Sequence, residues 1–160
     1  MTNFPLPATW DEPGLAGVGF QGFKLFSTVT PDDLPVAHGL YVILRAAIDQ
    51  AVILPTSRRR LKPYAVEDLL DRWVAGAPVV YIGSTIAKTG LQGRIGAFRR
   101  QAPNHSGGRS IWQLRDADEL VCAWVETPNH EADRVEDDYH DAFVKRYAKL
   151  PFANRKRRKI

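Results

Sequence analysis

The stretch PVVYIGST, residues 78–85, decides the fold class that this sequence predicts. Its valines and isoleucine favour an extended strand, and Gly83 with its polar neighbours favours a turn at the end. A similar strand, HGLYVILRAAI, precedes it at residues 38–48, and a third, LVCAWVET, follows at residues 120–127. Tyr81 is the unusual member, because it places a phenol hydroxyl directly before the turn. We ask whether this hydroxyl belongs only to the core or has a chemical role.

Apolar residues recur at helical spacing in the segments between and after these strands. A helix is expected in AVEDLLDRWVAG (65–76), where Gly76 stops the pattern. A helix of about three turns is expected in TGLQGRIGAFRRQA (89–102), a short one in RSIWQLRDA (109–117), and the longest in NHEADRVEDDYHDAFVKRYAKL (129–150). These elements predict an α+β fold, in which helices flank a small, mainly antiparallel, three-stranded sheet.

The chain divides into an arm and one domain. Residues 1–36 are rich in glycine and proline, which predicts an N-terminal arm packed on the domain, with a possible short strand at residues 23–29. The domain spans residues 37–156, and residues 50–77 form an insert within it. The AVILP segment at the start of this insert, residues 51–55, is a candidate hairpin partner for the preceding strand.

Length and composition indicate an ordinary globular domain. The 160 residues are 44% hydrophobic and 25% charged, which suits a single core. No apolar run approaches the roughly 18 residues of a membrane span, and the N-terminus lacks a signal-peptide pattern. We therefore expect no membrane contact and a cytoplasmic location. The single cysteine, Cys122, lies among strand formers and is expected to be a buried core residue.

Positive charge is concentrated in clusters. The net charge is +4, and the basic C-terminal tail at residues 155–160 supplies all of this excess. Two further clusters are SRRRLK at residues 57–62 and the pair Arg99-Arg100. Each cluster alone could be a solvated surface, but three on one small domain favour a polyanionic partner.

Two charged residues lie at the margins of apolar helical faces. On a helical wheel, Glu136 flanks the apolar stripe of the last helix, whereas Asp133, Asp137 and Asp141 point away from it. A carboxylate in such a place is either a boundary residue or a metal ligand or general base. Arg94 borders the apolar face of its own helix, where it could bind a phosphate or pair with an acid.

Taken in order, these residues resemble the GIY-YIG nuclease domain. The strand GLY ends on Tyr41, YIG contains Tyr81, and LQGR gives the family's L-x-x-R pattern with Arg94. A late helix carries Glu136, and Asn154 follows near the C-terminus. The resemblance covers roughly residues 38–156, most of the chain.

The resemblance implies a site for cutting phosphodiester bonds. Glu136 would bind one divalent cation, Mg²⁺ or Mn²⁺. Arg94 would stabilise charge on the phosphate oxygens. Tyr41 would be the base or would orient the attacking water, and a base role requires a depressed pKa. Tyr81 would help to position water or substrate, and Asn154 would tie the C-terminal segment to the site by amide hydrogen bonds.

The sequence departs from the family pattern in two ways. The segment between the two motif tyrosines is much longer than in compact members, and Phe98 stands where many members carry a histidine. His105, in the following loop, is a candidate substitute for that histidine. Basic residues that we expect to contact nucleic acid are Lys88, Arg58, Arg59, Arg60, Arg99 and Arg100.

The function expected from this resemblance is metal-dependent endonucleolytic cleavage of DNA. An enzyme that cuts both strands would favour a homodimer by symmetry. The alternative is a nucleic-acid-binding module without catalysis, whose nuclease site has decayed. A third hypothesis, an enzyme of unrelated chemistry, requires that the motif residues do not converge in space.

Overall fold

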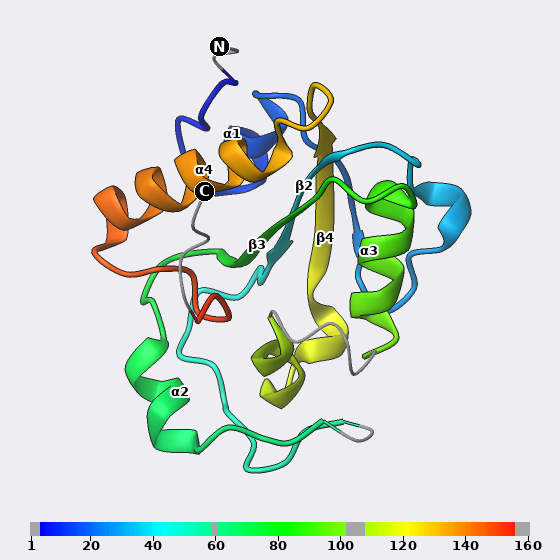
Figure 1. Cartoon of the computed structure of the whole chain (residues 1–160). Helices are drawn as coiled ribbons and strands as arrows, with labels where there is room; N and C mark the ends of the chain where they lie inside the picture. The colour runs from blue at the N-terminus through cyan, green and yellow to red at the C-terminus, as the bar shows by residue number, and fades with distance from the viewer. Residues whose placement is uncertain (1–3, 59–60, 102–107, 156–160) are drawn as a thin grey trace.

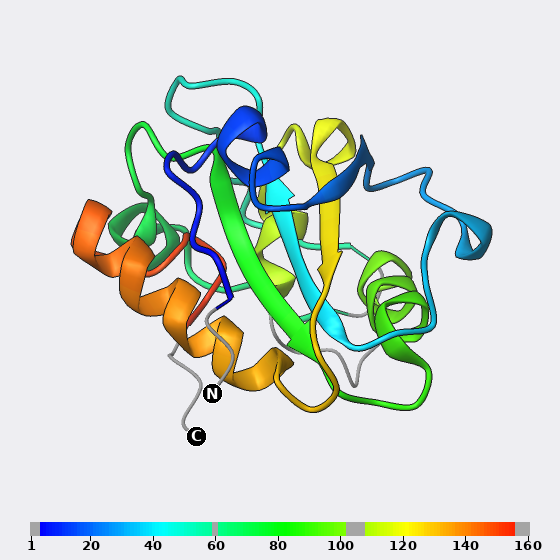
Figure 2. The same ribbon diagram turned by 90° about the horizontal axis from the view of Figure 1, so that it is seen from above.

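A four-stranded antiparallel sheet forms the centre of the molecule (Figure 2). The computed structural model describes residues 4–58, 61–101 and 108–155. The strand order is β1-β4-β2-β3, so β2 and β4 are central and β1 and β3 are the edges. The strands are β1 (Gln21–Leu25), β2 (Gly39–Leu44), β3 (Val79–Thr85) and β4 (Val121–Glu126). The α+β class predicted from the sequence is confirmed.

Helices cover both faces of the sheet (Figure 1). Helix α3 (Gly90–Arg99) packs on one face, and α4 (Ala132–Tyr147) packs on the other together with the short α1 (Glu12–Ala16). Helix α2 (Val66–Arg72) lies in the insert, and three 3-10 turns complete the described elements: η1 (Pro31–Asp33), η2 (Arg109–Gln113) and η3 (Ala117–Glu119). No helix in the described parts of the chain is both long enough and apolar enough to cross a bilayer.

The sheet separates two hydrophobic cores. Because side chains alternate along a strand, Tyr41 and Ile43 of β2 face the core under α3, whereas Leu40 and Val42 face the core under α4. All six residues of β2 are consequently buried. Cys122 of β4 is also fully buried, as expected.

The sheet has four strands and not the expected three. The additional strand, β1, comes from the N-terminal segment and pairs with β4. It starts earlier than the strand expected at residues 23–29 and ends at Leu25. The reason is local: Gly22 and Phe23 have positive φ angles at a bulge in the pairing, and the chain turns after Leu25, whose carbonyl accepts the N–H of Val29.

The expected hairpin partner AVILP is not a strand. Both edges of β2 are already paired, with β3 and with β4, so β2 has no edge left for residues 51–55. Ile53 instead forms an isolated bridge with Leu114. Helix α2 is also shorter than its apolar pattern: it ends at Arg72, and Trp73 is extended and packs on Phe152 with ring centroids 5.2 Å apart.

The C-terminal segment covers the exposed edge of β3. The backbone N–H of Ala153 donates to the carbonyl of Val80 at 2.8 Å, and the side chain of Asn154 bonds to Ile82. Helix α4 lies over the same strand. Because β3 is an edge strand, groups from α4, from the sheet and from the C-terminal segment can meet around it.

Candidate active site

Three aromatic rings form a compact wall on the α3 side of β2 and β3. Tyr41 is fully buried and Tyr81 is nearly so, and their ring centroids lie 5.9 Å apart. Phe98 of α3 packs against both, at 6.3 Å from Tyr41 and 5.1 Å from Tyr81. The position that carries a histidine in many GIY-YIG proteins is therefore occupied by a buried apolar ring, and Phe98 excludes water from this side of the two tyrosines.

Gly83 makes the approach of the two tyrosines possible. It lies opposite Tyr41 in the β2–β3 register. A Cβ atom at this position would lie 2.5 Å from Cζ and 2.6 Å from the hydroxyl oxygen of Tyr41, and 2.8 Å from the ring of Tyr81. Close contact, not an unusual backbone angle, is thus the reason for glycine here.

The sequence-predicted residues act electrostatically on one another. Burial is the largest influence on the hydroxyl of Tyr41 and raises its pKa well above its ordinary value of 10.0. The neighbouring Tyr81 raises this pKa further, also through a side-chain hydrogen bond. The positive charge of Arg94 opposes the shift, and the carboxylate of Glu136 adds to it. Residues from β2, β3, α3 and α4 therefore share one neighbourhood.

This result changes the expectation for Tyr41. A base role at neutral pH requires a depressed pKa, whereas burial raises the pKa of Tyr41. Of the two roles considered from the sequence, orientation of water or phosphate by the protonated hydroxyl agrees with this burial.

Glu136 is buried where α4 contacts β3, with 8% of its surface exposed. The hydroxyl of Ser84, on β3, contacts its Oε1. The same hydroxyl lies 3.2 Å from Oδ1 of Asp133, one turn earlier on α4. His140, one turn later and 1% exposed, places Nε2 3.7 Å from the other oxygen of Glu136. Glu136 is therefore held in an oriented polar cluster, and not as a boundary residue in water.

The helical wheel was wrong about Asp133. Residues three apart on a helix lie on the same side, so Asp133 joins Glu136 at Ser84. His140, which the sequence analysis did not select, is buried beside Glu136. The i, i+4 spacing of Glu136 and His140 was the available signal for this contact.

Asn154 makes the amide hydrogen bonds expected of it. Its Oδ1 accepts the N–H of Ile82 and its Nδ2 donates to the carbonyl of Ile82, both at 2.9 Å. These two bonds pair the outward-facing peptide groups of β3 between Tyr81 and Gly83. The C-terminal segment is thus attached directly beside the tyrosines.

The residues expected to contact nucleic acid differ in their surroundings. Lys88 and Arg100 are exposed, next to the two ends of α3. Arg99 donates to the carbonyl of Ser27 at 3.5 Å. Arg58 forms an ion pair with Asp118 at 2.6 Å and lies over the ring of Trp112. The remaining expected residues lie outside the described residues: His105, Arg59 and Arg60.

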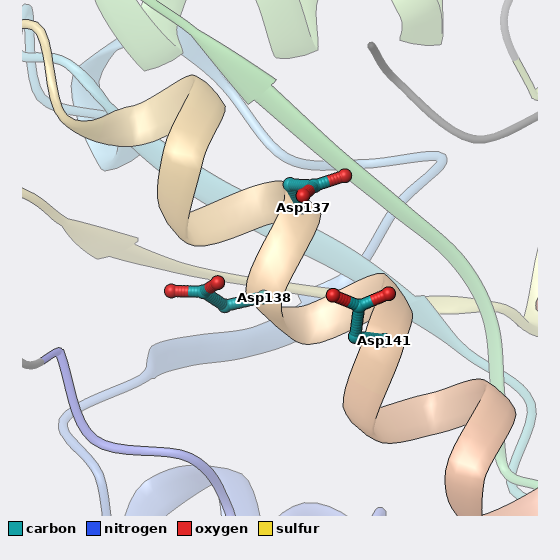
Figure 3. Close-up of side chains that lie close together, drawn as sticks. All are labelled: Asp137, Asp138 and Asp141. Carbon is teal, nitrogen blue, oxygen red and sulfur yellow. The ribbon is translucent and has the colours of Figure 1, made fainter. Parts of the chain in front are cut away.

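A second acidic group occurs on α4, away from Ser84. Ligand oxygens of Asp137, Asp138 and Asp141 lie within 4.8 Å of one another (Figure 3). Asp138 and Asp141 are exposed, and such groups are common on surfaces without a bound ion. This cluster does not include Glu136, so it provides a control position for tests of a metal site.

Comparison with known proteins assigns no family. No protein-family model matches the chain, and neither a curated protein nor a solved structure matches it.

Proposed function

We propose that this protein is a metal-dependent endonuclease that hydrolyses phosphodiester bonds in DNA through a GIY-YIG-type site. The observation that carries the proposal is the electrostatic neighbourhood of Tyr41, in which Tyr81, Arg94 and Glu136 all act on one hydroxyl. Together with Tyr41 these residues come from four separate elements, and they are the residues on which the sequence resemblance rests. An active site requires that its residues converge in space. A motif that matches by chance carries no such requirement.

The donor set around Glu136 suits a hard divalent cation. Glu136 and Asp133 supply carboxylate oxygens, and Ser84 supplies a hydroxyl oxygen between them. A hydroxyl carries a single hydrogen, so Ser84 cannot donate to both carboxylates at once. A cation bound here would be shared by these oxygens, and oxygen ligands are those that Mg²⁺ and Mn²⁺ prefer.

The protein residues have separate roles in this proposal. Glu136 holds the cation, which when bound neutralises charge on the phosphate and on the leaving oxygen. Arg94 places a planar guanidinium against the phosphate oxygens. Tyr41 and Tyr81 orient water or phosphate through their hydroxyl groups. Phe98 keeps this side of the site dry, which strengthens each electrostatic contact.

Replacement of Glu136 by Gln tests the proposal. The purified protein is incubated with Mg²⁺ or Mn²⁺ and with plasmid, single-stranded and branched DNA, and cleavage is followed on gels. The substitution Glu136→Gln keeps the size of the side chain but removes its charge, and we expect the cleavage rate to fall by at least about 100-fold. Asp138→Asn, on the same helix, removes an equal charge from the exposed cluster and should leave the rate unchanged. Cleavage that survives Glu136→Gln would refute the site assignment.

The second candidate function is nucleic-acid binding without catalysis. Phe98 in place of a histidine and the raised pKa of Tyr41 favour it, because neither side chain can take a proton at neutral pH. In that case the parent protein would bind DNA in the assay above and cleave none of the substrates.

A further inference from the structure

A tyrosine of the insert is held rigidly beside the candidate active site. Tyr64 lies just before α2, and the side-chain amide of Gln113 bonds to both of its peptide groups. Gln113 Oε1 accepts the N–H of Tyr64 at 2.8 Å, and its Nε2 donates to the Tyr64 carbonyl at 2.9 Å. Gln113 is itself 1% exposed, so the backbone of Tyr64 is fixed by a buried group.

Two arginines lie over the ring of this tyrosine. The guanidinium carbon of Arg155 is 3.9 Å from the ring centroid, and that of Arg109 is 4.4 Å from it. Stacking on an aromatic ring uses the face of a guanidinium and leaves its N–H donors at the edge available. The ring therefore holds two planar cationic groups in place.

The cluster carries more positive than negative charge. Asp68 accepts from Arg155 at 2.9 Å and lies 3.6 Å from Arg72. Arg109 forms no ion pair with any residue in the described parts of the chain, and its Nε is buried without a hydrogen-bond partner there. Arg72 and Arg155 thus share one carboxylate and Arg109 adds a further positive charge, an arrangement that a bound anion would complete.

The cluster is continuous with the candidate active site. Arg155 directly follows Asn154, whose amide bonds to Ile82 beside Tyr81. Arg109 directly follows Gly108, where a Cβ atom would lie 2.8 Å from the ring of Tyr81. In the sequence, four further basic residues come immediately after Arg155.

We infer that Arg109 and Arg155, stacked on Tyr64, bind a backbone phosphate of the DNA strand that passes through the proposed site. The choice of DNA as the ligand rests on the proposed function. The excess of positive charge around Tyr64 is independent of that function. Planar arginines match phosphate oxygens geometrically, and a phosphate beside Arg109 would supply the negative charge that its surroundings lack. The insert therefore contacts DNA through Tyr64 and the two arginines stacked on it.

The salt dependence of DNA binding tests this inference. Short fluorescein-labelled DNA, single-stranded and duplex, is titrated with full-length protein in EDTA, at salt concentrations from about 50 to about 200 mM. The variant Arg109→Gln should weaken binding at low salt, and the slope of log K against log salt should become shallower by about 0.7 for single strands or about 0.9 for duplex. Arg146→Gln is the matched control, since Arg146 also lies over a tyrosine, Tyr147, but on exposed α4 surface beside the N-terminal arm. It should leave the slope unchanged.

The outcomes separate this inference from the proposed nuclease activity. An unchanged slope for Arg109→Gln overturns the phosphate subsite even if the protein cleaves DNA in Mg²⁺. A shallower slope supports the subsite even if no DNA is cleaved. If Arg109→Gln does not fold, Arg109→Lys replaces it: the planar donors are lost and the charge is kept. Weaker binding at an unchanged slope is then expected, and wild-type affinity would contradict the inference.

Discussion

Gly83 shows how one residue without a side chain determines the geometry of the candidate site. The rings of Tyr41 and Tyr81 occupy the space that a Cβ atom at position 83 would need. Both tyrosines are closely packed, and Tyr41 has no exposed surface into which it could move. A methyl group at this position can be accommodated only if the rings shift together with Phe98, which packs against both.

The substitution Gly83→Ala should therefore destabilise the protein and disturb the site. We expect the free energy of unfolding to fall by about 1–3 kcal/mol, the usual cost of inserting a group into a packed core. Urea denaturation followed by fluorescence measures this change. Gly96→Ala in α3 is the control, because the added methyl meets only the flexible end of Arg100, and alanine favours the helix by up to about 1 kcal/mol. Equal stabilities of the two variants would contradict the packing argument.

At the scale of elements, the edge strand β3 depends on the C-terminal segment. An edge strand presents unpaired peptide groups, and here they are paired by Ala153 through its N–H and by Asn154 through its side chain. The same strand carries Tyr81 and Ser84, so its position sets the distance between the tyrosines and Glu136. The covering segment is thus part of the support of the site.

The substitution Asn154→Ala should remove the hydrogen bonds that attach the C-terminal segment to the edge of β3 at Ile82. The N–H and carbonyl of Ile82 would lose their partners in a buried place, which we expect to cost about 2–4 kcal/mol in the free energy of unfolding. Denaturant titration of the variant tests this value. Asn129→Ala, which truncates an exposed asparagine after β4, should change the stability by less than about 0.5 kcal/mol. A loss at Asn154 no larger than at Asn129 would show that the edge is held by other contacts.

At the scale of the whole molecule, the two cores enclose groups that ionise at alkaline pH, among them Cys122, Tyr41 and Tyr139. Cys122 and Tyr41 lie in the core on the α3 side, and Tyr139 lies in the core on the α4 side. Burial raises the pKa of all three above the ordinary values of 9.0 for the thiol and 10.0 for the phenols. The folded protein therefore keeps protons that the unfolded chain releases.

Stability should consequently decline at high pH. The contribution of these groups is fully present below pH 9, and it is lost progressively as the pH rises from the unfolded toward the folded pKa values. The expected slope is about 1.4 kcal/mol per pH unit for each group that is ionised only in the unfolded chain. Urea midpoints measured between about pH 8 and about pH 10.5 test this decline. In Cys122→Ala the decline should begin nearer pH 10, and a midpoint that stays constant over the whole range would contradict the buried state of these groups.

The local sequence pattern was sufficient to predict the helices and strands that carry the most apolar residues. Runs of β-branched residues predicted β2, β3 and β4, and helical spacing predicted α3 and α4. The pattern placed the N-terminal strand only approximately, at residues 23–29 where β1 spans Gln21–Leu25. It failed for residues 51–55, because β2 is already paired on both edges and Ile53 carries no local signal of that.

The sequence by itself determined which side chains were candidates, since the order of Tyr41, Tyr81, Arg94 and Glu136 along the chain can be read without a structure. Only the tertiary structure decided what surrounds them. Packing of α4 against the edge strand β3 brings Ser84 between Asp133 and Glu136, and burial raises the pKa of Tyr41 where a base would need it lowered. Both effects depend on distance and solvent exclusion between segments far apart in the chain, which are properties of the folded protein and not of any local pattern.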